Sequence, residues 1–224
     1  MTERTHQRLG SWLDALERPT LLWLAARLPL WITPNILTAI GFAGAGVTFV
    51  GYLLTPYTSY GLFLASVGFV INWFGDSLDG TLARYRRIAR NRFGYFLDNG
   101  LDMVAQFLIA IGIGLSGVIN WELCFLAFSI LLMTSSLSYI RAGVSPVHKL
   151  AYGGVGLTEM RLVGVFLNTL IFFVPSQTFG VLPMTYPNLL FLLWSVGTFI
   201  VFVASFVGQL RELAKEDPRP ERPE

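Results

Sequence analysis

The chain has 224 residues, of which 54% are hydrophobic and 13% are charged, and its mean hydropathy is +0.58. About a quarter of the residues in soluble domains are charged, so this composition argues against an ordinary soluble domain. The net charge is only +2, and we expect no nucleic-acid partner.

The N-terminal segment, residues 1–33, is the first predicted element. Its start is polar and charged, without the short apolar core of a signal peptide. Apolar residues recur there at i, i+3, i+4 and i+7, which is typical of one helical face. This pattern predicts an amphipathic helix in the membrane interface on the cytoplasmic side; a helix docked against protein is the alternative. The apolar face consists of Leu9, Trp12, Leu13 and Leu16.

Six apolar stretches follow, each near the length of about 20 residues that crosses the hydrocarbon core of a membrane. A soluble all-α protein with buried helices is the alternative, but few charges lie in these stretches outside one cluster. We therefore predict an all-α fold: a six-transmembrane-helix bundle over residues 34–214, followed by a Pro-rich, charged and disordered tail at 215–224. The predicted spans are residues 35–55, 59–85, 93–115, 120–140, 157–175 and 186–211.

The basic residues give this arrangement a direction. All 16 Lys and Arg residues fall on one side of the six-span arrangement. The loops on the other side, near 56–58, 116–121 and 176–185, contain none. The positive-inside rule therefore predicts a multi-pass protein of the inner or plasma membrane with both termini in the cytoplasm.

Four aspartates surround the basic turn between the second and third spans, and acidic residues inside a membrane are costly enough to suggest a function. Asp76 and Asp79 are three residues apart and Asp98 and Asp102 are four apart, so each pair shares a helical face. Both pairs lie at similar distances from the turn, near residues 88–89. In an antiparallel hairpin all four carboxylates would meet at one depth, near the cytoplasmic membrane boundary.

Carboxylates gathered so closely cannot all stay ionised without compensation. Protonation of some of them is one solution. The other is to bind one or two divalent cations, and all-oxygen ligands suit Mg²⁺ or Mn²⁺. Two such ions can hold a diphosphate and stabilise charge on attacking and leaving oxygens. Gly80, Ala83 and Gly94 lie on the same faces, where small side chains either leave room for a ligand or allow tight helix packing.

The two halves of this region read D-x-x-D-G-x-x-A-R and G-x-x-x-D-x-x-x-D. Together they resemble the signature of the CDP-alcohol phosphatidyltransferase family, although the gap between the halves is one residue longer than in the family pattern. A second sequence, at Pro34–Thr38, resembles a P-N-x-x-T element at the first span of this family. The positions that match the signature are Asp76, Asp79, Gly80, Ala83, Arg84, Gly94, Asp98 and Asp102.

The resemblance implies a membrane phosphotransferase that acts on a CDP-linked lipid or alcohol among membrane lipids and forms a homodimer. It implies that all four aspartates, Asp76, Asp79, Asp98 and Asp102, bind Mg²⁺ or Mn²⁺, and that two ions are held. Asp102 would also act as the general base. The residues that would bind the nucleotide are Asn35, Thr38, Asp79, Gly80, Ala83, Arg84 and Gly94.

Candidates for binding the acceptor alcohol come from the charges on two other spans. Arg141 ends the fourth span, and Glu159 and Arg161 begin the fifth, on the predicted cytoplasmic side. The two arginines would suit an anionic acceptor such as an inositol phosphate or a glycerol phosphate, with anchoring by the positive-inside rule as the alternative. His148, in the loop between them, is expected to have no role.

We therefore expect the transfer of a phosphatidyl group from CDP-diacylglycerol to the hydroxyl group of a polar acceptor, with release of CMP. One alternative is a CDP-choline or CDP-ethanolamine phosphotransferase that uses diacylglycerol as the acceptor, and the segment at 28–35 is in keeping with that branch. A membrane prenyltransferase and a cation transporter are more remote alternatives. The sequence has no second Asp-rich motif for the former, and transport sites tend to lie nearer the bilayer midplane.

Overall fold

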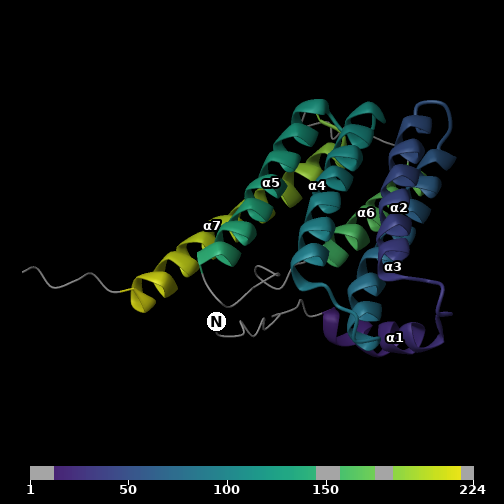
Figure 1. The fold of residues 1–224 in the computed structure, drawn as a ribbon. Coiled ribbons are helices and arrows are strands. Elements are labelled where there is room, and N and C mark those ends of the chain that lie inside the picture. The colour runs from purple at the N-terminus through teal and green to yellow at the C-terminus, as the bar shows by residue number, and fades with distance from the viewer. Residues whose placement is uncertain (1–12, 145–156, 175–183, 218–224) are drawn as a thin grey trace, which may run out of the picture.

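The computed structural model describes residues 13–144, 157–174 and 184–217, and every regular element within them is an α-helix (Figure 1). This arrangement confirms the predicted all-α class. The helices are α1 (Asp14–Arg27), α2 (Pro34–Leu54), α3 (Tyr60–Tyr85), α4 (Asn91–Leu115), α5 (Trp121–Val144), α6 (Leu157–Phe173) and α7 (Tyr186–Glu216).

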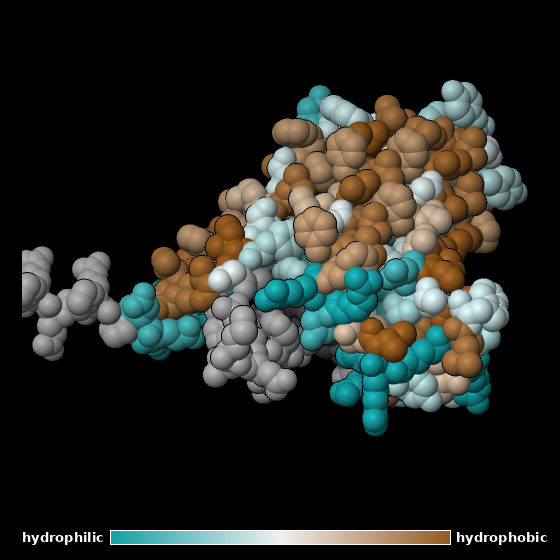
Figure 2. Space-filling model, in the orientation of Figure 1, coloured by the Kyte–Doolittle hydropathy of each residue, from teal (hydrophilic) through white to brown (hydrophobic). Residues whose placement is uncertain are grey.

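Five helices, α2, α3, α4, α5 and α7, are long and apolar enough to cross a membrane. Apolar residues cover most of the visible side of the bundle, and hydrophilic residues gather near α1 (Figure 2). The chain is therefore an integral membrane protein. The predicted span at 157–175 coincides with α6, whose 17 residues rise about 26 Å at 1.5 Å per residue. That length is short of a hydrocarbon core of about 30 Å, and the sixth crossing stays a prediction.

The C-terminal boundary differs slightly from the expected one. Helix α7 continues to Glu216, so the first two residues of the predicted tail, 215 and 216, are helical. The last turn of the helix carries Lys215, a cation that interacts favourably with the carbonyl end of a helix. Residues 218–224 and His148 lie outside the described part of the chain.

Helix α1 lies across the end of the bundle where α3 finishes and α4 begins (Figure 1). It packs on α3 through Leu21 and Ala25, which are buried. Of the predicted apolar face, Leu16 is 68% exposed and Leu13 is half-buried, while Leu9 and Trp12 lie outside the described residues. Placement of this helix in the membrane interface therefore stays a prediction.

Arg86, directly after α3, holds the link between α1 and α2. Its guanidinium group donates hydrogen bonds to the carbonyl oxygens of Leu28, Pro29 and Ile32 at 2.8, 3.0 and 2.6 Å. Hydrogen bonds from a charged donor are stronger than neutral ones. The start of α2, which is capped by the side chain of Thr33, is consequently fixed relative to the end of α3.

Glycines bring α2 and α3 into backbone contact. A Cβ atom added at Gly44 would lie 2.9 Å from the carbonyl oxygen of Gly68 and equally close to the Cα atom of Asn72, whereas Gly46 faces open space. Close approach of this kind is typical of small residues between membrane helices. Helix α2 also packs against α4, while α3 and α4 make little direct contact with each other. Thus α2 is the element that holds both halves of the aspartate motif in place.

Replacing Gly44 with Ala should destabilise the protein by about 1–3 kcal/mol, the usual cost of overpacking, because the new methyl group would push α2 away from α3. Gly46→Ala is the matched control, since it adds the same group to the same helix in open space, where Ala is the better helix former. Thermal unfolding in detergent measures the difference. Equal melting temperatures for the two variants would contradict the close packing of α2 and α3.

Candidate functional site

Three of the four aspartates lie together. Asp76 on α3 and Asp98 and Asp102 on α4 each place one carboxylate oxygen within 4.8 Å of the other two, and all three residues are partly buried. Oxygens that share one hard cation at about 2.1–2.5 Å are separated by no more than about 5 Å. The group therefore has the spacing and the chemistry of a divalent-cation site.

The three carboxylates line a small cleft between α2, α3 and α4. Its walls also include Thr38 of α2 and Asn72 of α3. The P-N-x-x-T element at the start of α2 therefore reaches the aspartate motif through its threonine. Asn35, in the first turn of α2, is exposed.

Asp79 stands beside the three-carboxylate group and is not part of it. Its Oδ2 atom accepts a hydrogen bond of 2.6 Å from the Thr38 hydroxyl, and its Oδ1 atom accepts one from the backbone N–H of Gly80. Three residues along a helix correspond to about 60° of rotation and 4.5 Å of rise relative to Asp76. This offset aims the Asp79 carboxylate at α2, whereas Asp76 faces α4 and α6.

Arg161, on α6, supplies the positive charge next to the cluster. Its Nη2 atom lies 2.7 Å from Oδ2 of Asp76, and its Nε atom donates to Oδ1 of Asn72 at 2.7 Å. The Asn72 amide in turn donates to the carbonyl oxygen of Gly41 at 2.8 Å. The Arg161 side chain is only 10% exposed. A buried cation with this many partners orients the Asp76 carboxylate and offsets part of its charge.

The remaining predicted nucleotide contacts lie toward the turn between α3 and α4. A Cβ atom on Gly80 would have the guanidinium group of Arg84 as its nearest neighbour, at 3.2 Å, and one on Gly94 would meet nothing within 4 Å. Ala83 is half-buried, and Arg84 donates to the hydroxyl of Thr81 at 3.3 Å. Neither glycine is used for helix packing, so their small size leaves space at the surface of this turn.

The predicted acceptor residues are divided between two places. Arg161 meets the cluster as described, and Glu159 is buried two residues before it on α6, about half a helical turn away. Arg141 is buried at the end of α5, where its Nη2 atom lies 3.5 Å from Glu212 and 3.7 Å from Glu216 of α7. Arg141 does not line the cleft.

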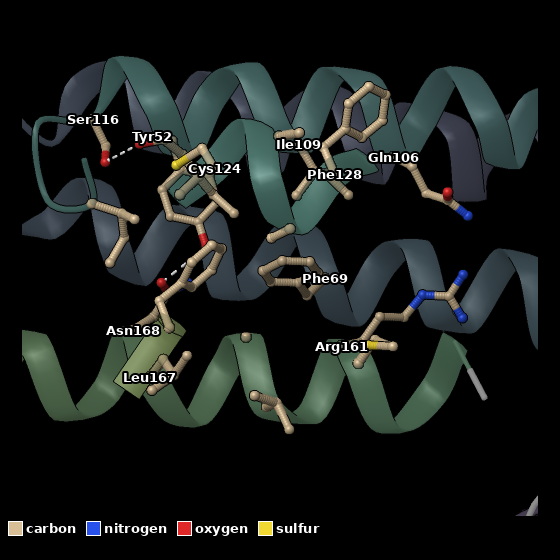
Figure 3. A pocket seen from close by; sticks show the side chains of 18 of the residues that line it. Tyr52, Phe69, Gln106, Ile109, Ser116, Cys124, Phe128, Arg161, Leu167 and Asn168 are labelled. Atoms are coloured by element: carbon tan, nitrogen blue, oxygen red, sulfur yellow. Dashed lines mark hydrogen bonds between the residues drawn. The ribbon is translucent and has the colours of Figure 1, made fainter. Parts of the chain in front are cut away.

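A second, much larger cavity adjoins the cleft, and Asn72, Asp102 and Ala105 line both. It runs between the helices toward the other end of the bundle (Figure 3). Asp102 thus stands where a polar cleft meets an apolar interior.

Two polar residues in this region were not predicted from the sequence to belong to the site. Asn72 lies one turn before Asp76, and Gln106 lies one turn after Asp102, each at a spacing of four residues. Such spacing places them on the stripes that carry the aspartates. The sequence signal that could have identified both residues is an uncharged amide side chain within an apolar span, since polar groups in membrane helices need partners.

Comparisons with known proteins show the family to which the chain is related. The family model described as CDP-alcohol phosphatidyltransferase matches residues 31–210. An archaetidylinositol phosphate synthase of Pyrococcus horikoshii is 31% identical over 147 residues, which cover 63% of this chain and 77% of the relative. A cholinephosphotransferase 1 of Danio rerio is 27% identical over 204 residues, covering 78% of this chain and 52% of the relative. A second archaetidylinositol phosphate synthase, from Methanothermobacter thermautotrophicus, is 36% identical over 108 residues.

The chain belongs to the CDP-alcohol phosphatidyltransferase family, as the sequence motifs indicated. It is accordingly a phosphotransferase of the class that releases CMP. The chain spans about half the length of the Danio rerio relative and of the Methanothermobacter relative, at 52% and 51%.

A double-mutant cycle tests the contact between Arg161 and Asp76. Arg161→Met should lower the melting temperature in EDTA, because three neighbouring carboxylates lose the cation that faces them. Adding Asp76→Asn to that variant should recover part of the loss, since it removes the charge that Arg161 neutralised. We expect a coupling of about 0.5–3 kcal/mol, the range for residues in direct contact. Strictly additive effects would contradict the ion pair.

Proposed function

We propose that this chain catalyses the metal-dependent transfer of a phosphatidyl group from CDP-diacylglycerol to the hydroxyl group of a polar, anionic acceptor, with release of CMP. The observation that carries the proposal is the meeting of Asp76, Asp98 and Asp102 where the polar cleft joins the apolar cavity. A lipid-linked diphosphate needs both environments, one for its charged head and one for its hydrocarbon chains.

The carboxylate group fits a divalent cation. The three partly buried carboxylates each place an oxygen within 4.8 Å of the others, and Arg161 contacts one of them, Asp76. Asp76, Asp98 and Asp102 would hold one or two Mg²⁺ or Mn²⁺ ions, with Asp79 as a further ligand after release from Thr38. When bound, these ions would supply the positive charge that stabilises the diphosphate and the departing CMP.

The nucleotide would be bound at the turn between α3 and α4. Thr38 lines the cleft, and Gly80, Ala83 and Gly94 leave space between it and the solvent. Asn35 and Arg84 would supply polar contacts at the rim, because both are exposed and a guanidinium group binds phosphate oxygens in a two-point contact.

Asp102 is proposed as the general base. It lines both the cleft and the larger cavity, so a hydroxyl group that enters either space reaches its carboxylate. Asp102 accepts the proton of the acceptor hydroxyl as that oxygen bonds to the β-phosphorus of the donor. The bond from this phosphorus to the oxygen of CMP breaks, and CMP leaves with the electron pair.

An anionic acceptor is favoured by charge and by the relatives. Arg161 lies at the cleft, and Glu159 is close to it along α6. Two relatives are named as archaetidylinositol phosphate synthases, and the alignment spans more of the first one than of the Danio rerio cholinephosphotransferase. We propose that Arg141 and Arg161 bind the anionic group of an inositol phosphate or a similar acceptor, and that Glu159 supports this site.

The proposed enzyme faces the cytoplasm and works as a homodimer. The carboxylate site lies toward the end of the bundle that carries α1 and the basic residues Arg84 and Arg86, which the positive-inside rule assigns to the cytoplasm.

The second candidate function is a CDP-choline-type phosphotransferase that uses diacylglycerol as acceptor. It is favoured by the cholinephosphotransferase relative that aligns with 78% of this chain.

Purified protein in detergent should release CMP from CDP-diacylglycerol only when Mg²⁺ or Mn²⁺ and one polar acceptor are present. Asp76→Asn, Asp98→Asn and Asp102→Asn should each lower turnover by at least about 100-fold, the lower range for a lost acid–base group. Glu122→Gln, which removes an exposed carboxylate at the start of α5, is the control and should keep full activity. Full activity in the Asp76 and Asp98 variants would refute the metal site.

CMP release from CDP-choline with diacylglycerol, in place of CDP-diacylglycerol, would establish the second candidate.

Replacing Arg141 with Gln should raise the KM for an anionic acceptor several-fold and leave kcat unchanged, because a uniform binding contact is lost. Because the Arg141 side chain is itself only 4% exposed, the melting temperature of the variant is compared with that of the wild type to confirm that it folds. Arg211→Gln, on the exposed surface of α7, is the matched control. An unchanged acceptor KM would return Arg141 to an anchoring role.

A further inference from the structure

The larger cavity extends deep into the bundle. It is lined by residues of helices α2 to α7, and its cavity volume is about 140 Å³. Gln106 and Arg161 lie at one end, Phe69 in the middle, and Ser116 and Asn168 at the other end (Figure 3). From Asp102 to Ser116 helix α4 rises about 21 Å, so the cavity follows much of a hydrocarbon core of about 30 Å.

The middle of this cavity is apolar, with Phe69, Ile109, Phe128 and Leu131 among its lining side chains. Native interiors are packed to crystal-like density and rarely leave large voids. The apolar lining of this cavity suits a hydrocarbon chain.

Polar groups close the far end of the cavity, and they satisfy one another. The Tyr52 hydroxyl donates to Oδ1 of Asn168 at 3.0 Å, and the Asn168 amide donates to the Ser66 hydroxyl at 3.2 Å. The Ser116 hydroxyl donates to the carbonyl oxygen of Ile113 at 2.6 Å. These groups need no hydrogen bonds from a ligand. They form a polar floor against which a hydrocarbon chain would end.

Gln106 differs from these residues. Its side-chain oxygen Oε1 is buried and has no hydrogen-bond partner among the described residues. It lines the cavity one turn from Asp102, and its side chain and that of Arg161 point toward each other from opposite walls (Figure 3). Buried polar atoms are nearly always hydrogen-bonded, so an exception at the edge of a cavity indicates a missing partner.

We propose that one hydrocarbon chain of the lipid substrate lies inside the bundle in this cavity. We further propose that Gln106 is a positioning residue for the glycerol backbone of that lipid. With the amide turned over, so that Nε2 faces the cavity, its N–H donates a hydrogen bond to an ester oxygen of the glycerol backbone. The glycerol backbone of the lipid then lies one helical turn from Asp102, and the phosphate of the lipid lies in the cleft. This inference rests on the proposed function, and it adds the path of the lipid and a residue that selects it.

The occupant follows from the continuity of the two spaces. Asp102 and Asn72 line both of them, so the molecule whose phosphate occupies the cleft has the cavity as its nearest apolar space. A polar acceptor would gain nothing from an apolar lining. Water would find few partners there, because an apolar cavity of any size holds water poorly.

Lipid-induced stabilisation tests this placement without relying on turnover. Dioleoyl and dioctanoyl CDP-diacylglycerol are added in turn to detergent-purified protein, and the melting temperature is followed. Ala110→Phe adds a ring to the cavity lining on α4, while Val104→Phe adds the same ring to the exposed face of the same helix. We expect the dioleoyl lipid to stabilise wild type and Val104→Phe, and to stabilise Ala110→Phe much less. The dioctanoyl lipid should stabilise all three proteins alike.

A second substitution guards against misfolding. Ala127→Leu narrows the same cavity from α5, and we expect it to shift the preference toward the shorter lipid in the same way. Full stabilisation of folded Ala110→Phe and Ala127→Leu by the dioleoyl lipid would overturn the proposal. If CMP release by those variants persisted at the same time, the proposed function would stand. Selective stabilisation without any CMP release would support the cavity assignment and refute the proposed function.

The role of Gln106 has its own readout. Gln106→Met keeps the length of the side chain and removes its hydrogen-bonding groups. We expect the KM for CDP-diacylglycerol to rise about tenfold at both chain lengths and the acceptor KM to stay unchanged, because only the contact with the glycerol backbone is lost. Equal effects on both substrates, or none on the lipid, would assign Gln106 a purely structural role.

Discussion

Three carboxylates held within 4.8 Å of one another inside an apolar bundle are the feature on which the rest of this structure depends. Burial of like charges is unfavourable unless opposite charge or hydrogen-bond donors compensate for it. The chain provides compensation from α6, where the buried Arg161 contacts Asp76, and the proposed divalent cations would add to it. A fold that simply maximised stability would not retain this cluster. Its presence identifies the place where stability has been exchanged for chemistry.

Backbone contact between α2 and α3 is what makes that cluster precise. Because Gly44 and Gly68 allow the two helices to touch, the Asn72 amide reaches the carbonyl oxygen of Gly41 and is fixed there. Asn72 then holds Arg161 through its other amide atom, at 2.7 Å. A larger residue at the helix contact would therefore displace the arginine as well as the helix. Packing between α2 and α3 and charge compensation at Asp76 are parts of one arrangement.

The spacing of the aspartates was sufficient to predict that Asp76, Asp98 and Asp102 would meet, since helix periodicity places them at one depth on facing stripes. It failed to separate Asp79, because an equal distance from the turn says nothing about which neighbouring helix a side chain faces. The partnership between Arg161 and Asn72 joins residues 89 positions apart. No local pattern encodes such a contact. The cavity was equally out of reach, because it arises where α3 and α4 stay apart, and the hairpin argument assumed that they pack together.

An enzyme that joins a membrane lipid to a water-soluble alcohol must bring two phases to one carboxylate. The position of Asp102, on the boundary between the polar cleft and the apolar cavity, meets this requirement without any moving part. In the proposed reaction, the nucleotide head of CDP-diacylglycerol would lie at the turn between α3 and α4, where a Cβ atom on Gly94 would meet nothing within 4 Å. Its hydrocarbon chain would lie along α4, and the acceptor would enter from the turn. The phosphorus would then stand beside Asp102 only when the lipid is bound.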